Sequence, residues 1–278
     1  MAKFPTTVCC SKTYEGFLTK VLRILGNMKK LGFLLLLTIC WCQPINAQTY
    51  HQAHADRLAE WVMANARKSF SHQVISEGEK LLDYCQVYNV ESPIITEALY
   101  HLAYEYYQID SISKSLFACN KALDIHYSIE ADNYEMEALL LALRASTFAA
   151  KKDMENAMDS ANKAWKSVKK ASMDFDTLNK IFIRLNSVCR KLGYYSNAIK
   201  ISEDYVQLLQ QYEFNEWHHN EALLYLSENY LDGKELEKAE KTADSILAST
   251  NESRLRFKAT NIKEIITAAK EREASSGK

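Results

Sequence analysis

Glycine and proline are scarce in this chain, whose 278 residues include only 7 Gly and 3 Pro. Sandwiches and barrels of β-strands need many more of the residues that turn a chain. An all-β fold is therefore nearly excluded, and an alternating α/β fold is disfavoured. Apolar residues are plentiful at 47%, beside 25% charged residues. This balance is typical of a folded protein rather than a disordered one.

The chain also lacks an excess of charge of one sign. It has 34 basic and 35 acidic side chains, a net charge of −1. Residues 1–47 hold six of the basic residues and one acidic residue, so the remainder carries a net charge of −6. Negative charge disfavours non-specific binding to nucleic acids and to anionic membranes. We expect no nucleic-acid partner, and membrane contact only through the N-terminal segment if that segment is retained.

Motifs for catalysis and cofactor binding are missing as well. There is no glycine-rich phosphate loop, G-x-S-x-G elbow, H-E-x-x-H pair or C-x-x-C pair. His218 and His219 are adjacent, and adjacent side chains on a helix point about 100° apart, which does not suit one metal ion. Nothing in the sequence brings Cys189 and His126 together as a nucleophile and its base. We expect no enzyme activity, no cofactor and no metal.

The N-terminal region resembles a secretory signal. Met28-Lys29-Lys30 precedes an apolar run at 31–42, which is followed by Gln43-Pro44, a helix-breaking pair, and by Ala47. Twelve residues extend only about 18 Å as a helix, less than the roughly 30 Å hydrocarbon core of a bilayer. The sequence predicts a signal peptide at 28–47 that is cleaved after Ala47. A retained membrane anchor is the alternative.

Residues 1–27 do not fit in front of such a signal, because secretion signals begin at the initiator Met. We expect translation to start at Met28 and residues 1–27 to be an extension. Export through this signal predicts a periplasmic protein of a Gram-negative bacterium. Three cysteines then remain, Cys85, Cys119 and Cys189, and we expect them to be small buried side chains on helices.

The rest of the chain repeats with a period of 41 or 42 residues. Asn120-Lys-Ala-Leu-Asp recurs as Asn162-Lys-Ala-Trp-Lys, 42 residues later. In each unit a first helix has apolar positions spaced i, i+3, i+4 and i+7, which form one helix face. The first position is occupied by Leu58, Leu99, Leu141, Phe182 and Leu223. The second is occupied by Trp61, Leu102, Arg144, Leu185 and Leu226, where Arg144 departs from the pattern.

A second helix in each unit carries a small residue at one fixed position. These residues are Gly78, Cys119, Ala161, Ser202 and Ala243. Small side chains at corresponding positions allow two helix backbones to approach closely. We expect the five residues to be buried where the helices of a hairpin meet.

Turns and helix starts follow the same period. Turns are expected around Ser69, Asp110-Ser111, Lys152-Asp153, Gly193 and Asp232-Gly233. Ser92-Pro93 predicts a helix start, because Ser is a good N-cap and Pro is tolerated at the first helical position. Asp132, Asp174 or Asp176, and Asn215 are the caps expected for later units.

These spacings resemble the tetratricopeptide repeat (TPR) family, in a long form with units of 41–42 residues instead of about 34. The resemblance covers about residues 53–250, in five units. A capping helix is expected at 253–273, with an apolar stripe that includes Leu255, Phe257, Ile262, Ile265 and Ile266. The fold expected is an all-α, right-handed solenoid of antiparallel helix hairpins at 48–273, with a frayed tail at 274–278.

The resemblance implies that the first helices line a binding groove. Transferred to this chain, that groove contains tyrosines, then cations, then a tyrosine beside an acid: Tyr100, Tyr104, Tyr107, Lys180, Arg184, Arg190, Lys191, Tyr225 and Glu228. Aromatic side chains with polar tips are typical recognition anchors, and a row of cations suits a carboxylate or an acidic partner. Two alternatives stay open. The tyrosines could pack against a neighbouring unit, and the cations could form a solvated flank paired with local acids.

The leading hypothesis is a non-catalytic scaffold of the cell envelope that binds a protein or peptide. A second hypothesis is a sensor module, because exported TPR units resemble the sensor parts of certain histidine kinases and regulators. A third is a glycan-binding helical repeat protein, for which the tyrosine face around Tyr100 is the only indication.

Overall fold

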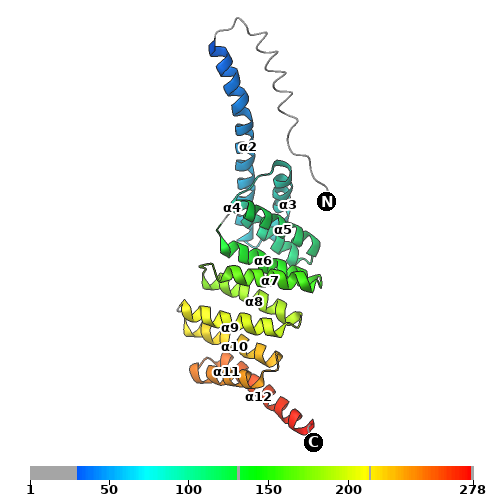
Figure 1. Ribbon diagram of the computed structural model, residues 1–278, viewed down its shortest axis with the longest axis vertical. Coiled ribbons are helices and arrows are strands. Elements are labelled where there is room, and N and C mark those ends of the chain that lie inside the picture. The colour runs from blue at the N-terminus through cyan, green and yellow to red at the C-terminus, as the bar shows by residue number, and fades with distance from the viewer. Residues whose placement is uncertain (1–29, 130–131, 213, 277–278) are drawn as a thin grey trace. The chain divides into compact units, whose positions relative to one another are not determined.

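In the computed structural model the described residues are 30–129, 132–212 and 214–276. Within them the chain forms eleven helices and no strand (Figure 1). The helices are α2 (Lys30–Ala66), α3 (Ser71–Tyr88), α4 (Pro93–Gln108), α5 (Ile112–Ser128), α6 (Tyr134–Ala150), α7 (Met154–Val168), α8 (Phe175–Lys191), α9 (Tyr195–Gln211), α10 (Glu216–Asp232), α11 (Leu236–Ser249) and α12 (Ser253–Ser276). The scarcity of Gly and Pro is consistent with this helical content.

The chain divides into two compact parts, Met1–Ala53 and His54–Lys278. In the first part the backbone is helical from Lys30 onwards and stays helical through Pro44, where the sequence predicted a break. The predicted extension 1–27 and Met28 lie outside the described residues. None of the helices that the structure describes is both long enough and apolar enough to span a bilayer.

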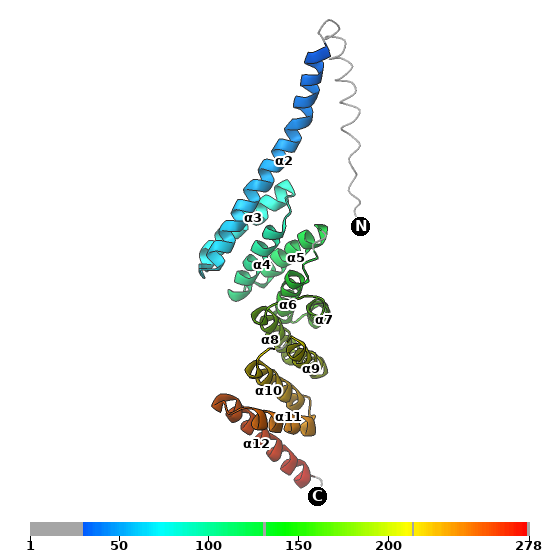
Figure 2. The ribbon, with the colours of Figure 1, turned by 90° about the vertical axis from the view of Figure 1, so that its left-hand side faces the viewer.

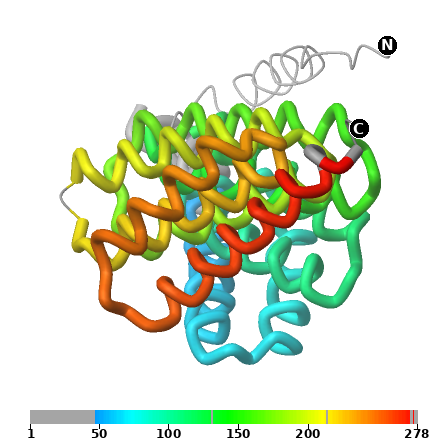
Figure 3. The backbone as a smooth tube through the Cα atoms, turned by 90° about the horizontal axis from the view of Figure 1, so that it is seen from below, coloured from blue at the N-terminus to red at the C-terminus, as the bar shows by residue number. Residues whose placement is uncertain are grey.

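The second part is a stack of helix hairpins in sequence order. Each unit from the second to the fifth contributes one helix to each of two layers (Figure 2). The first-helix layer contains α4, α6, α8 and α10, and the second-helix layer contains α5, α7, α9 and α11. Helix α12 packs on α11 and also contacts α10 (Figure 3). A single hairpin cannot bury its apolar face, whereas stacked hairpins bury each other's faces.

The five small positions of the second helices are buried, as predicted, but the contacts of three of them are not within their own hairpin. Gly78 meets Leu102 of α4, Cys119 donates to Leu140 O of α6 at 3.2 Å, and Ser202 accepts from Asn229 of α10. The predicted location is wrong for these three, because each second helix also packs against the first helix of the next unit. Cys119, Ala161 and Ser202 each have 0% of their surface exposed. At Gly78 a Cβ atom would lie 2.8 Å from Cδ1 of Leu102 on α4, closer than atoms pack. The small residues therefore let neighbouring helices approach each other.

Every hairpin turn has the same geometry. One residue in each of these turns lies in the left-handed region, at Ser69, Asp110, Lys152, Gly193 and Lys234, and these residues are 41 or 42 positions apart. After each of them an N–H group bonds back to the carbonyl five residues earlier, for example Tyr194 N to Cys189 O at 2.9 Å. This is the Schellman ending of a helix. The turns were predicted correctly, but in the fifth unit the left-handed residue is Lys234 and not Gly233.

The helix starts are mostly those predicted. Ser92 caps α4 with Pro93 at its first position, Asp174 caps α8, and Asn215 caps α10. The prediction of Asp132 for α6 is wrong, because Asn133 accepts the bond from the Met136 N–H at 3.0 Å. Either residue type can cap, and the local turn decides which one does.

Some predicted core residues are exposed. Trp61 is 44% exposed, and on the capping helix Phe257 and Ile265 are 67% and 53% exposed. The buried stripe of α12 consists of Leu255, Ala259, Ile262 and Ile266, a stricter i, i+4, i+7, i+11 spacing than the one predicted. Trp61, Phe257 and Ile265 lie beside the buried face of their own helix, and their side chains are exposed to solvent. Helix α12 continues to Ser276, and residues 277–278 lie outside the described residues.

Polar contacts join successive units. The Tyr106 hydroxyl donates to Glu79 at 2.5 Å, and the Tyr230 hydroxyl donates to Glu203 at 2.7 Å, so the same contact recurs three units apart. Between α8, α9 and α10, the buried Asn229 amide donates to Asn186 at 2.8 Å and to Ser202 at 2.6 Å. Buried polar groups without partners are costly, so these bonds favour one alignment of the hairpins.

Candidate binding face of the first-helix layer

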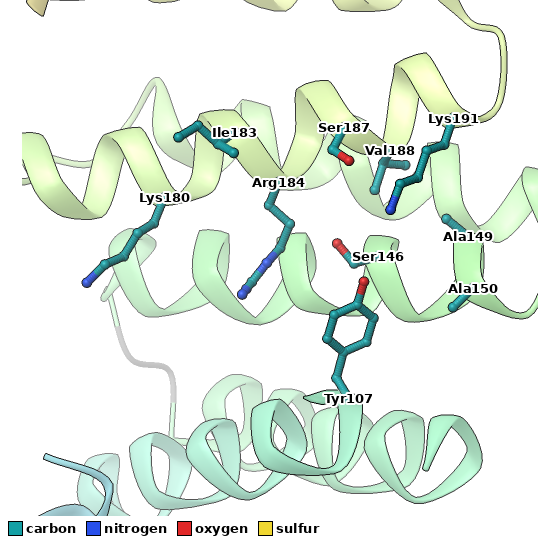
Figure 4. A pocket seen from close by; sticks show the side chains of 10 residues that line it. All are labelled: Tyr107, Ser146, Ala149, Ala150, Lys180, Ile183, Arg184, Ser187, Val188 and Lys191. Atoms are coloured by element: carbon teal, nitrogen blue, oxygen red, sulfur yellow. The ribbon is translucent and has the colours of Figure 1, made fainter. Parts of the chain in front are cut away.

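A hollow of about 390 Å³ lies on the first-helix layer between α4, α6 and α8. We call it the α6–α8 hollow. Helix α8 forms one side, small residues of α6 form the base, and Tyr107 of α4 forms the opposite side (Figure 4). Its lining residues are Tyr107, Ser146, Ala149, Ala150, Lys180, Ile183, Arg184, Ser187, Val188 and Lys191.

Three cations of α8 line this hollow. They are Lys180, Arg184 and Lys191, and none of them forms an ion pair with any carboxylate of the described residues. The charge of one of them, Lys180, affects a histidine on another helix. Burial lowers the pKa of His101 on α4, and the charges of Arg67 and Lys180 lower it further. Hydrogen bonds from Thr177 lower the pKa of Asp174 at the start of α8, and the charge of Lys180 lowers it further. The hollow is therefore a site of positive charge without ion pairs among the described residues, on a chain that is negative as a whole.

Arg184 is held by an aromatic ring. Its guanidinium carbon lies 5.4 Å from the centre of the Tyr104 ring on α4. A guanidinium that contacts a ring keeps the N–H donors at its edge available for a carboxylate. The sequence placed Tyr104 and Arg184 in the second and fourth units, and the structure brings them together across α6.

The base of the hollow exists because α6 carries small residues there. Ser146, Ala149 and Ala150 come from the run Ala-Ser-Thr-Phe-Ala-Ala at 145–150, and their short side chains leave space beside the long ones of α8. Sequence reasoning identified the cations and Tyr107 but missed these three residues, Ile183 and Val188. The only signal in the sequence was the small size of Ser146, Ala149 and Ala150. Small residues indicate a hollow only when the position of the neighbouring helix α8 is known.

The opposite flank of α8 is neutralised. Arg190 forms ion pairs with Glu228 at 3.0 Å and with Asp232 at 2.7 Å, both on α10. The alternative of pairing with local acids therefore applies to Arg190, whereas Lys180, Arg184 and Lys191 have no such partner among the described residues. The sequence predicted basic residues followed by acidic residues along the groove. In the structure, the basic Arg190 of the fourth unit and the acidic Glu228 and Asp232 of the fifth unit form ion pairs with each other.

The four tyrosines predicted for the groove are partly buried and pack against the core. Tyr100, Tyr104, Tyr107 and Tyr225 all pack partly against the apolar core. The Tyr225 ring contacts Phe182 edge-on at 5.4 Å, and burial raises the pKa of Tyr225. Of these tyrosines, Tyr107 alone lines the hollow. The structure thus brings together Tyr107, Lys180, Arg184 and Lys191, and places Tyr225 and Glu228 outside the hollow.

No arrangement suited to covalent or metal chemistry is seen in the described part of the chain. Cys85, Cys119 and Cys189 are buried and free, and burial raises the pKa of Cys119 and of Cys189 to about 12. A thiol with such a pKa is a poor nucleophile at neutral pH. The described residues contain no group of three or more His, Cys, Asp or Glu placed to hold a metal ion. His218 instead stacks on Phe175 at 3.5 Å.

Comparison with known proteins shows similarity of fold. A kinesin-light-chain-like protein of nearly identical TPR-like repeats from Podosopora anserina aligns with a TM-score of 0.55 and 14% identity, over 72% of this chain and 99% of that one. BtubC (BKLC) from P. vanneervenii aligns with a TM-score of 0.53 and 16% identity, over 81% of this chain and 86% of that one. No protein-family model and no curated protein matches.

The fold is therefore a TPR-like helical repeat solenoid, as the sequence predicted. At these identities the likeness concerns architecture alone, since one fold serves many functions. The function has to be argued from the site.

Proposed function

We propose that this chain is a non-catalytic scaffold of the cell envelope that binds a protein or peptide on its first-helix layer. The observation that supports this most directly is the α6–α8 hollow, in which three cations of α8 face small residues of α6 and form no ion pair with a carboxylate in the described part of the chain. Solenoids commonly use such extended faces for binding. In the proposal the signal peptide at 28–47 exports the chain to the periplasm.

Binding is tested with a photo-crosslinking amino acid placed at Ile183, which is 42% exposed and lines the hollow. The matched control position is Lys200 on α9, which is exposed and belongs to the second-helix layer. We expect discrete protein or peptide adducts from position 183 and none from position 200. Equal adducts at both positions, or none at either, would contradict a binding face on the first-helix layer.

Export is tested separately by fractionating cells that express the full chain and by sequencing the N-terminus of the purified protein. We expect a periplasmic protein that begins at Gln48, directly after the proposed cleavage site. A cytoplasmic protein, or one that keeps residues 28–47, would contradict the cleaved signal but would leave the binding face to be judged by crosslinking.

A further inference from the structure

The two flanks of helix α8 differ in how their cations are neutralised. On the flank towards α10, Arg190 is paired by two carboxylates of the next unit. On the flank towards α6, Lys180, Arg184 and Lys191 face the side chains of Ser146, Ala149 and Ala150, which carry no charge. The same helix thus forms ion pairs on one side and none among the described residues on the other, where the only carboxylate whose pKa the charge of Lys180 is shown to lower is that of Asp174 at the start of α8.

The three cations that form no ion pair lie in a row along α8. Lys180 and Arg184 are four residues apart on α8, a rise of about 6 Å, and Lys191 is seven residues further, about 10.5 Å. Side chains on one face of an extended peptide recur every two residues, at about 6.7 Å. The first gap differs from this step by less than about 1 Å, whereas the second gap lies between one step and two steps, about 6.7 and 13.4 Å. An extended chain with acids at alternate positions therefore matches the spacing of Lys180 and Arg184, and the long flexible side chain of Lys191 has to reach about 3–4 Å along the helix to meet a third carboxylate.

The rest of the hollow suits a peptide backbone. The side chains of Tyr107, Ser146 and Ser187 line it. The Ser146 hydroxyl donates to Ala142 O at 3.2 Å and can still accept, and no hydrogen bond among the described residues uses the Tyr107 hydroxyl. Hydroxyls can donate and accept, as the N–H and C=O groups of a peptide require. Ile183 and Val188 add apolar surface between the cations. A ligand that is both acidic and peptidic satisfies these groups together.

We propose that the α6–α8 hollow binds an extended acidic peptide segment whose alternate carboxylates pair with Lys180, Arg184 and Lys191. Arg184, positioned by the Tyr104 ring, is the central contact. This inference rests on the proposed function and narrows its partner to an acidic, extended stretch of chain.

The test uses the full chain and a labelled probe, acetyl-Glu-Ala-Glu-Ala-Glu-Ala-Glu, with binding followed by fluorescence anisotropy. A second probe of the same composition places its four Glu residues in one block. We expect the alternating probe to bind more tightly than the block probe, and to bind more weakly as salt is raised. Equal binding of the two probes would mean attraction of net charge only and would overturn the proposal.

The variants compared are Lys180→Glu with Arg184→Glu, and the control pair Lys166→Glu with Lys200→Glu. The control pair makes the same charge change at exposed positions of α7 and α9, in the second-helix layer. We expect the first pair to weaken binding of the alternating probe at least tenfold and the control pair to leave it within about twofold. Equal weakening by both pairs would overturn the site.

Two further measurements complete the test. The milder Arg184→Gln, with folding checked by circular dichroism, should also weaken binding, roughly tenfold, so a misfolded double variant does not decide the outcome. A hyaluronan oligosaccharide that binds the cations while the acidic probe does not would overturn the peptide assignment. If neutral peptides crosslink at position 183 and the acidic probe does not bind, the scaffold function stands and this inference fails.

Discussion

At the scale of single residues, burial separates side chains that look alike in sequence. Trp61 and Leu102 occupy equivalent repeat positions, yet Trp61 is 44% exposed and Leu102 is fully buried. Leu102 also explains Gly78, because the two residues meet where a Cβ atom would not fit. The small position was evident from the repeat, but the partner that makes it necessary was not.

Gly78→Leu should lower the free energy of unfolding by about 1–3 kcal/mol, because the added side chain would overlap Leu102. Chemical denaturation followed by circular dichroism measures the change. Ser76→Leu, at an exposed position of the same helix, is the control and should change stability by less than about 0.5 kcal/mol. Equal effects at the two positions would show that close approach at Gly78 is unimportant.

His101 should make stability depend on pH. Burial and the charges of Arg67 and Lys180 lower its pKa in the folded state, so the unfolded state takes up the proton more readily. Stability is then complete above the ordinary pKa of about 6.5 and is lost as pH falls from there through the lowered value. Denaturation midpoints between pH 7.5 and 5.5 should fall less in His101→Gln than in the natural chain. In the control His72→Gln, which alters an exposed side chain, they should fall as in the natural chain.

At the scale of elements, the turn between the two helices of a unit is the most regular feature. Five turns place one residue each at positive φ, but only Gly193 of these residues is a glycine. The sequence therefore located the turns through their period while it could not identify the left-handed residue. Lys152 and Lys234 adopt φ values of 62°, which a side chain disfavours and the Schellman bonds compensate.

Lys152→Gly should raise the free energy of unfolding by up to about 1 kcal/mol, because glycine adopts positive φ without steric strain. Its neighbour supplies the control. Lys151 has a helical φ of −75°, so Lys151→Gly should lower stability, by up to about 1 kcal/mol. Thermal melts of the two variants should shift in opposite directions. Shifts of the same sign would rule out strain at residue 152.

At the scale of the whole molecule, each hairpin of the stack is stabilised mainly by its neighbours. Helix α12 ends the stack by covering α11 and part of α10, with its buried residues Leu255, Ala259, Ile262 and Ile266. Loss of this cover should loosen the C-terminal hairpin first and leave distant hairpins folded. A compact globular core would instead respond as one unit.

Ile265 and Ile266 allow a matched test, because they are adjacent on α12 and are 53% and 0% exposed. Ile266→Asp should destabilise the end of the stack by about 3 kcal/mol or more, since it buries a charge and leaves a cavity. Ile265→Asp should have little effect. Hydrogen exchange should show lost protection in α12 and α11 of Ile266→Asp, with α4 to α7 still protected. Uniform loss across the chain would contradict a solenoid.

The candidate site shows the limit of sequence reasoning. Lys180, Arg184 and Lys191 were found from their positions on one helix, and Tyr107 was found from the repeat. The sequence did not show that Arg190, unlike these three cations, forms ion pairs, because its partners lie 38 and 42 positions further along the chain. The hollow itself arises from an absence of bulk at Ser146, Ala149 and Ala150.

By itself the sequence determined that the chain is helical, that it repeats every 41 or 42 residues, where its turns fall and where small residues are needed. These properties follow from the local geometry of the helix and its period of 3.6 residues, which hold whatever lies next to it. Only the tertiary structure decided which flank of α8 meets carboxylates and which meets an open hollow. That outcome depends on how neighbouring hairpins are rotated against each other, and it is set by contacts between residues distant in sequence.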